Sequence, residues 1–187
     1  MDEKEVSMIN AKGIIILSAF ILILVTVLVF VNGMDSLTNI IGFENLEDNP
    51  VVFEIDSEEI REITINMPKE NFTLFKDSND IWKCKNADFI VDTEKIETLV
   101  SSLSYVYAYE LIEKNSQKLS DYGLDDPEYT ITAVTEDKSV TFYRGKETPV
   151  GNYYYFKTSD SDDVYSQYSE KCKIFFKESM YYQKDIG

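Results

Sequence analysis

The chain has 187 residues, including 34 Asp and Glu but only 18 Lys and Arg, so its formal net charge is −16. This length allows one ordinary domain and a short additional segment. Nucleic-acid binding needs a basic surface, and the acidic balance, with only two arginines, argues against it. The absence of histidine removes the commonest general base and metal ligand and excludes Ser-His-Asp, Cys-His and HExxH sites. We therefore expect no enzyme, no catalytic residue, no metal and no cofactor.

Residues 13–31 read GIIILSAFILILVTVLVFV, an uncharged apolar run. At about 1.5 Å per helical residue it spans roughly 28 Å, close to the hydrocarbon thickness of a bilayer. A cleaved signal peptide and a buried soluble helix are the competing interpretations. A signal peptide usually has a shorter apolar region and an A-x-A-like cleavage site, and Val31-Asn32-Gly33 fits such a site poorly. The pattern favours one uncleaved transmembrane helix over residues 13–33.

The orientation of this helix follows from its flanking basic residues. Lys4 and Lys12 precede it, and the next basic residue after it is Arg61. Positive residues favour the cytoplasmic side, so we expect a single-pass protein of the cell membrane with a cytoplasmic tail, 1–12. Residues 34–50, acidic and without sustained periodicity, form a predicted linker. Residues 51–187 form the predicted extracytoplasmic domain.

The first half of that domain combines strands with one helix. Ile63, Ile65 and Met67 alternate with polar residues as in a half-buried strand. Residues 72–76 and 81–85 flank four turn-forming residues and predict a hairpin. Asp92 is a candidate N-cap for a helix over 93–104, whose predicted buried stripe consists of Ile96, Leu99, Val100 and Leu103.

The second half is richer in strands. One strand is predicted over 106–112, and a short helical piece over 117–122 should end at Gly123, with Pro127 just beyond. A last helix is expected from Ser169, with Cys172, Phe175, Phe176 and Met180 on one face. Four further strands are predicted over 129–135, 140–144, 153–157 and 164–168. Short hairpin turns pair strands antiparallel, so the fold class is α+β, a mostly antiparallel sheet with helices on one face.

The segment LSDYGLDDPEYTIT, residues 119–132, resembles a bacterial family, domain-of-unknown-function family 4340, whose signature is Y-G-L-D-x-P before a strand. Here the signature is carried by Tyr122, Gly123, Leu124, Asp125 and Pro127. The I-x-I strand, the single tryptophan strand, the amphipathic helix and the aromatic strand after Gly151 follow in the same order. The resemblance covers roughly residues 51–180.

This resemblance implies a role at the membrane. Relatives often begin with one membrane helix and are encoded beside ABC-type export permeases and gliding-motility-like transporters. It thus implies an extracytoplasmic accessory or scaffold domain whose partner is a membrane protein such as a permease. The alternative is a surface module that binds cell-wall glycan or a small molecule through an aromatic sheet face.

Few residues qualify as candidate sites. The signature residues could form a binding corner, although Gly, Leu and Pro have structural uses at such a turn. The acidic pairs 125–126 and 58–59 are a weak glycosidase signal, because adjacent carboxylates rarely converge on one bond. Residues 160–163, DSDD, offer carboxylates to calcium but lack the glycine and distal glutamate of an EF-hand loop, which favours a solvated turn.

Tyrosines and cysteines complete the candidates. Tyr153, Tyr154 and Tyr155 place aromatic rings on both faces of one strand, and an exposed face would be a partner-binding surface. Residues 105, 107 and 109, all tyrosine, line one side of the earlier strand in the same way. Cys84 and Cys172 are expected as two separate buried thiols, and the alternative is one disulfide beneath the last helix.

Overall fold

The structure of the chain is a computed structural model that describes residues 17–18, 21, 49–85 and 87–185. Leu17, Ser18 and Ile21, within the predicted membrane segment, are helical. The rest of that segment, the predicted tail and the linker up to residue 48 lie outside the described residues. Within the described part, no helix has the length and apolar character needed to cross a membrane. Asn49–Gly187 forms one compact unit.

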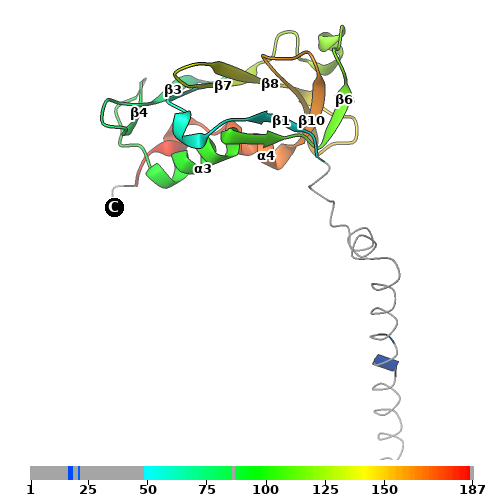
Figure 1. Ribbon diagram of the computed structural model, residues 1–187, viewed down its shortest axis with the longest axis horizontal. Coiled ribbons are helices and arrows are strands. Elements are labelled where there is room, and N and C mark those ends of the chain that lie inside the picture. The colour runs from blue at the N-terminus through cyan, green and yellow to red at the C-terminus, as the bar shows by residue number, and fades with distance from the viewer. Residues whose placement is uncertain (1–16, 19–20, 22–48, 86, 186–187) are drawn as a thin grey trace, which may run out of the picture. The chain divides into compact units, whose positions relative to one another are not determined.

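This unit is an α+β domain built on a large antiparallel sheet, as predicted (Figure 1). The eight-stranded sheet has the order β4-β3-β2-β7-β8-β9-β10-β6, and β1 pairs with β5 in a separate two-stranded sheet. The elements are β1 (Val51–Glu54), η2 (Ser57–Glu59), β2 (Glu62–Asn66), β3 (Asn71–Lys76), β4 (Trp82–Cys84), α3 (Thr93–Ser104), β5 (Tyr105–Tyr107), β6 (Glu110–Glu113), η3 (Leu119–Tyr122), β7 (Tyr129–Val134), β8 (Ser139–Glu147), β9 (Tyr153–Thr158), β10 (Val164–Tyr168), α4 (Ser169–Phe175) and η4 (Ser179–Tyr182).

The helices α3 and α4 lie on one face of the large sheet, and β1 lies on the same side (Figure 1). Ile63 and Ile65 on β2 alternate inward and are fully buried, as their spacing predicts. All four residues of the predicted stripe on α3 are buried as well. The Asp92 carboxylate accepts hydrogen bonds from the backbone N–H groups of Glu94 and Lys95, so the predicted N-cap of α3 is confirmed.

The predicted β3–β4 hairpin is confirmed, and its turn is held by one aspartate. The Asp77 carboxylate accepts backbone hydrogen bonds from Asn79 and Ile81 and lies 2.7 Å from Lys83 Nζ. The hydrogen bond from Lys83, together with these two backbone bonds, lowers the pKa of Asp77. Cys84 is buried on β4 while Lys83 is exposed, so the strand has one inward and one outward face.

The predicted strand over 106–112 is wrong, because the chain changes sheets within it. β5 pairs with β1, whereas β6 pairs with β10. Between them the Ala108 N–H bonds to the Pro50 carbonyl and the Tyr109 N–H bonds to the Ser166 carbonyl. Alternating apolar residues continue through this crossing, so the sequence pattern gives no sign of it.

The last helix is shorter than expected. α4 ends at Phe175, and Phe176 is its C-cap residue. Met180 was expected on the same apolar face, but it lies in η4 and is 66% exposed. Instead Tyr182, from η4, enters the core and packs beside Phe72, with 6.0 Å between the ring centroids. Both cysteines, Cys84 and Cys172, are buried free thiols.

Candidate interaction site

Three tyrosines from different parts of the sequence stack at the β10–β6 end of the large sheet. Tyr153 on β9 and Tyr168 on β10 are direct cross-strand neighbours, with ring centroids 4.8 Å apart. The Tyr109 ring lies 4.6 Å from Tyr153 and 5.0 Å from Tyr168. All three side chains are half-buried. We call these residues the tyrosine cluster, and their partly exposed rings form an aromatic surface.

Tyr155 lies on the same side of β9 as Tyr153, because side chains alternate along a strand. Its ring packs 4.9 Å from Tyr122, the first residue of the Y-G-L-D-x-P signature. The Tyr122 hydroxyl donates to a Glu113 carboxylate oxygen at 2.9 Å, and Ser116 Oγ donates to the same oxygen at 2.7 Å. These two bonds lower the pKa of Glu113, and the bond to Glu113 raises the pKa of Tyr122. Glu113 thus connects the signature to β6.

Tyr154 faces the other way and does not join the tyrosine cluster. Its ring lies 4.6 Å from the guanidinium carbon of Arg144, on the face of the sheet that also carries the buried Phe156. The structure therefore divides the three consecutive tyrosines between two faces, with Tyr153 and Tyr155 on one and Tyr154 on the other.

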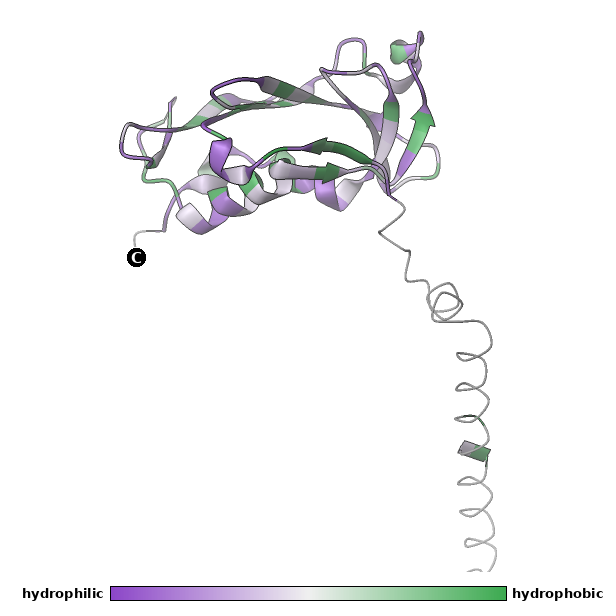
Figure 2. Ribbon diagram, in the orientation of Figure 1, coloured by the Kyte–Doolittle hydropathy of each residue, from purple (hydrophilic) through white to green (hydrophobic). Residues whose placement is uncertain are grey.

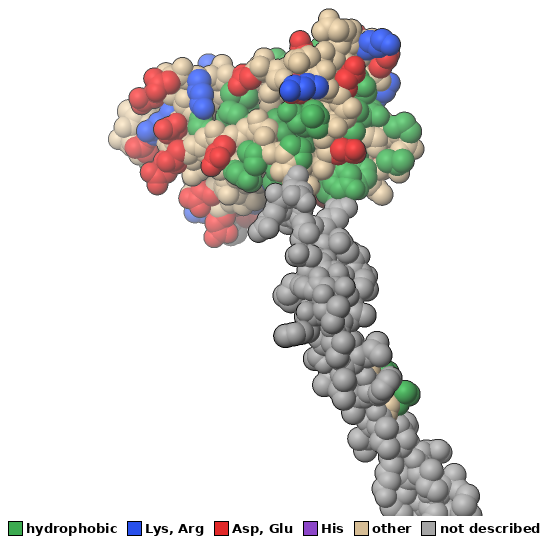
Figure 3. Space-filling model, turned by 45° about the vertical axis from the view of Figure 1, so that its right-hand side comes forward, with side chains coloured by type: hydrophobic (Ala, Val, Ile, Leu, Met, Phe, Trp, Pro, Cys, Tyr) green, Lys and Arg blue, Asp and Glu red, His purple; other side chains and the backbone are tan. Residues whose placement is uncertain are grey.

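The strand β6 beside the tyrosine cluster is an edge strand. It follows β10 at the end of the sheet order, and no other described strand pairs with it. Leu111 and Ile112 on β6 are 42% and 37% exposed. β6 reads ELIE, and Figure 2 shows the hydrophobic part of this strand in green. Figure 3 shows hydrophobic side chains gathered over this end of the domain. An exposed apolar edge offers unpaired backbone groups to another chain.

The signature itself forms a tight corner against β8. Gly123 caps η3 with φ of 68°, a left-handed conformation that favours glycine. Leu124 is only 4% exposed. A Cβ on Gly145 would lie 2.2 Å from the Tyr122 carbonyl oxygen and 3.0 Å from Leu124 Cγ, so the corner packs where β8 has no side chain. Asp125 is exposed and Pro127 is half-buried.

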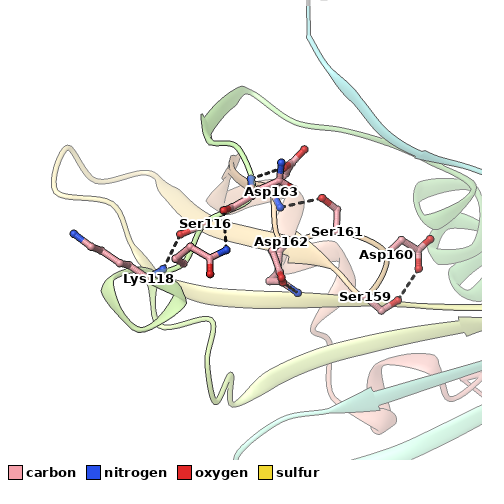
Figure 4. A network of polar contacts seen from close by, with 10 residues as sticks. Ser116, Lys118, Ser159, Asp160, Ser161, Asp162 and Asp163 are labelled. Atoms are coloured by element: carbon pink, nitrogen blue, oxygen red, sulfur yellow. Dashed lines mark hydrogen bonds and ion pairs between the residues drawn. The ribbon is translucent and has the colours of Figure 1, made fainter.

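The other carboxylate candidates have simple environments. Asp126 is exposed beside Asp125, and Glu58 and Glu59 are exposed on η2, a separate element. In the acidic turn the carboxylates have partners within the chain (Figure 4). These contacts are Ser159 Oγ to Asp160 at 3.0 Å, Lys157 Nζ to Asp162 at 3.1 Å and the Asn115 N–H to Asp163 at 2.7 Å. No three acidic or cysteine side chains of the described ranges converge as metal ligands.

The acidic turn also anchors the loop after β6. The Ser116 N–H donates to the Asp162 carbonyl oxygen, and Ser161 Oγ accepts from the Asp163 N–H. Lys157 is only 8% exposed, and its ammonium also lies 5.1 Å from the Tyr143 ring centroid. A buried ammonium needs a counter-ion, and Asp162 supplies it. The turn is therefore tied to β9 and to the loop that follows Glu113.

A cleft of about 980 Å³ lies at the other end of the sheet, beside β4. Its lining includes Trp82 and Phe89, together with Ile81 and Ile90, which are 56% and 62% exposed. The Lys76 ammonium lies 5.4 Å from the Trp82 ring centroid. The volume is in the range of small-molecule sites, although the cleft is wide and open. Sequence reasoning missed this feature because it depends on the packing of β4 against the segment before α3.

Comparisons with known proteins bear on the family alone. No curated protein and no solved structure matches the chain. A family model described as "Domain of unknown function (DUF4340)" matches residues 82–167. This range runs from β4 to β10 and contains the Y-G-L-D-x-P corner and the edge strand β6. It also contains Tyr109 and Tyr153 of the tyrosine cluster, and Tyr168 is the next residue after it. Residues 82–167 are thus identified as a DUF4340 domain, a domain of unknown function.

Proposed function

We propose that this domain is a non-enzymatic protein-binding module, and that it contacts its partner through the β10–β6 end of the large sheet. The observation that carries the proposal is the tyrosine cluster beside an apolar edge strand. Stacked, half-exposed tyrosines supply a large and rigid contact area at low cost in conformational entropy. Leu111 and Ile112 add exposed apolar side chains on the adjoining edge strand β6. An unpaired edge adds backbone hydrogen bonds to such a contact.

The membrane context of the proposal comes from the sequence. The uncharged run at 13–31 supports an anchor, and Lys4 and Lys12 support a cytoplasmic tail. With this topology the domain is extracytoplasmic and its partner is a membrane protein, such as the permease of an ABC-type transporter. The family resemblance supports that choice of partner. The domain then acts as an accessory or scaffold subunit of the assembly.

Co-purification tests this proposal. The chain is isolated from native membranes in mild detergent, and its partners are identified by mass spectrometry. We expect a membrane protein in stoichiometric amount. The double substitution Leu111→Ser with Ile112→Ser should release it, because it removes the apolar part of the edge without touching the buried core.

The matched control is Ile81→Ser with Ile90→Ser, which removes two exposed isoleucines at the opposite end of the domain. The control should retain the partner. Equal loss from both double variants, or retention by both, would contradict a contact at β6. Unfolding temperatures of the two variants should stay within a few degrees of the parent chain, because exposed positions contribute little to stability.

A second function, a surface module for glycan or a small molecule, is favoured by the cleft beside β4. Trp82 offers an aromatic platform there. Retention of the purified chain on immobilised cell-wall glycan, lost in Trp82→Ala but not in the Leu111/Ile112 double variant, would support this function. Partner capture with the reverse dependence supports the protein-binding module.

A further inference from the structure

Arg144 on β8 is enclosed by aromatic rings. Its guanidinium carbon lies 3.3 Å from the ring centroid of Tyr129, 4.6 Å from that of Tyr154 and 5.3 Å from that of Phe176. Tyr129 is its direct neighbour across β7 and β8. A guanidinium that lies over aromatic faces keeps the in-plane N–H edge for hydrogen bonds. The rings therefore fix the orientation of the cation without occupying its donors.

Arg144 has no carboxylate within ion-pair distance among the described residues, although the chain carries 34 acids. The other arginine, Arg61, pairs with Asp80 at 2.5 Å, and the buried Lys157 pairs with Asp162. The thiol of Cys172 lies close enough for Arg144 to affect its ionisation, but burial raises the pKa of that thiol to about 12 and keeps it neutral. Arg144 is thus a partly desolvated cation without an anion of the described chain beside it.

The two ends of the guanidinium have different surroundings. Nε is buried without a hydrogen-bond partner, and Arg144 lines a cavity of about 10 Å³ together with Gln167. Such a volume is about that of one water molecule. Neither Nη atom donates a hydrogen bond to a described residue. Neither is fully enclosed, so this end of the half-buried side chain reaches the surface. The pair of Nη donors is the free end.

We propose that Arg144, held by Tyr129, Tyr154 and Phe176, is a binding site for a carboxylate of a ligand or partner. A carboxylate accepts two parallel hydrogen bonds from a guanidinium edge, a geometry that a ring-bound arginine presents in advance. The site lies on the face of the sheet opposite the tyrosine cluster, so it is distinct from the contact proposed above and does not depend on it.

The sequence provides a direct test, since Arg61 and Arg144 are the only two arginines. The ¹⁵N spectrum of the arginine Nε–H groups of the detergent-solubilised chain therefore contains two signals. Arg61→Lys and Arg144→Lys each remove one of them and so assign the spectrum. Sodium acetate is titrated at constant ionic strength, and Arg61 serves as the internal reference in the same sample.

Acetate should shift the Arg144 signal along a saturating curve and leave the Arg61 signal nearly unchanged. N-acetylglycine and a glutamate blocked at both backbone ends separate a terminal carboxylate from a side-chain carboxylate, according to which binds more tightly. Parallel, non-saturating shifts of both signals, or no shift of Arg144, would overturn the proposal. Tighter saturation by inorganic phosphate would overturn the assignment to carboxylate.

Discussion

The two halves of the large sheet are built differently. The half formed by β2, β3 and β7 buries aliphatic side chains, and Ile63, Ile65, Leu74 and Ile131 are all fully enclosed under α3. The half formed by β9, β10 and β6 carries rings that stack on one another and remain half-exposed. Full burial of aliphatic groups contributes most to folding, whereas exposed rings leave contact area available. The comparison separates a region that maintains the fold from a region suited to binding.

The largest expected effect is on the aliphatic half. Ile65→Ala should lower the free energy of unfolding by about 2–5 kcal/mol, because it removes buried atoms and leaves a cavity in a fully enclosed site. Leu111→Ala on β6 should cost less than about 0.5 kcal/mol. Urea unfolding of both variants measures the difference. Similar losses for the two would show that the halves do not differ in this way.

Gly145→Ala tests how closely the signature corner, which adjoins the aromatic half, packs against β8. The added Cβ would meet the Tyr122 carbonyl at 2.2 Å, a contact with backbone that a rotamer change does not relieve. We expect a loss of about 1–3 kcal/mol in unfolding free energy, as for other overpacked sites. Lys146→Ala, at the adjacent exposed position, is the matched control and should be nearly neutral. A neutral Gly145→Ala would mean that the corner of the signature moves freely away from β8.

The two cysteines test two environments separately, the cleft beside β4 and the cavity beside Arg144. Cys84 lines the open cleft, whereas Cys172 is 4% exposed in the small cavity by Arg144. With its pKa raised to about 12 by burial, Cys172 has about one thiolate in ten thousand molecules at pH 8. Iodoacetamide at pH 8, followed by peptide mass spectrometry, should modify Cys84 first and Cys172 only on unfolding. Earlier modification of Cys172 would contradict the enclosed environment of α4.

The smallest effect concerns the ionisation of Glu113, a half-buried residue at the end of β6. Its pKa lies below the ordinary value of 4.5 because Ser116 and Tyr122 donate to its carboxylate. A lowered folded pKa stabilises the fold above pH 4.5, and this contribution is lost as the pH falls through the folded pKa. Tyr122→Phe should raise the Glu113 pKa toward 4.5 and flatten the acid dependence of stability. Carboxyl ¹³C titration measures the shift, and an unchanged Glu113 pKa would show that the Tyr122 bond does not form in solution.

Local patterns in the sequence determined much of the fold. The alternation around Ile63, the cap at Asp92, the stripe on α3 and the turn after β3 follow from interactions within a few residues, and the structure has all of them. Gly123 has the left-handed conformation expected at the end of a helical turn. Such features depend on period, capping and turn chemistry, which a short segment carries by itself.

Only the tertiary structure decided which segments meet. The predicted strand 106–112 is split because its first part pairs with β1 and its second part pairs with β10. Both partners are distant in the sequence, so the split is a long-range property. The same holds for the stacking of Tyr109 on Tyr153 and Tyr168, and for the rings around Arg144, which come from β7, β9 and the end of α4. The sequence places an arginine after Tyr143 but carries no local signal that distant rings will enclose it. Contacts of this kind arise from sheet order and packing, which no single segment encodes.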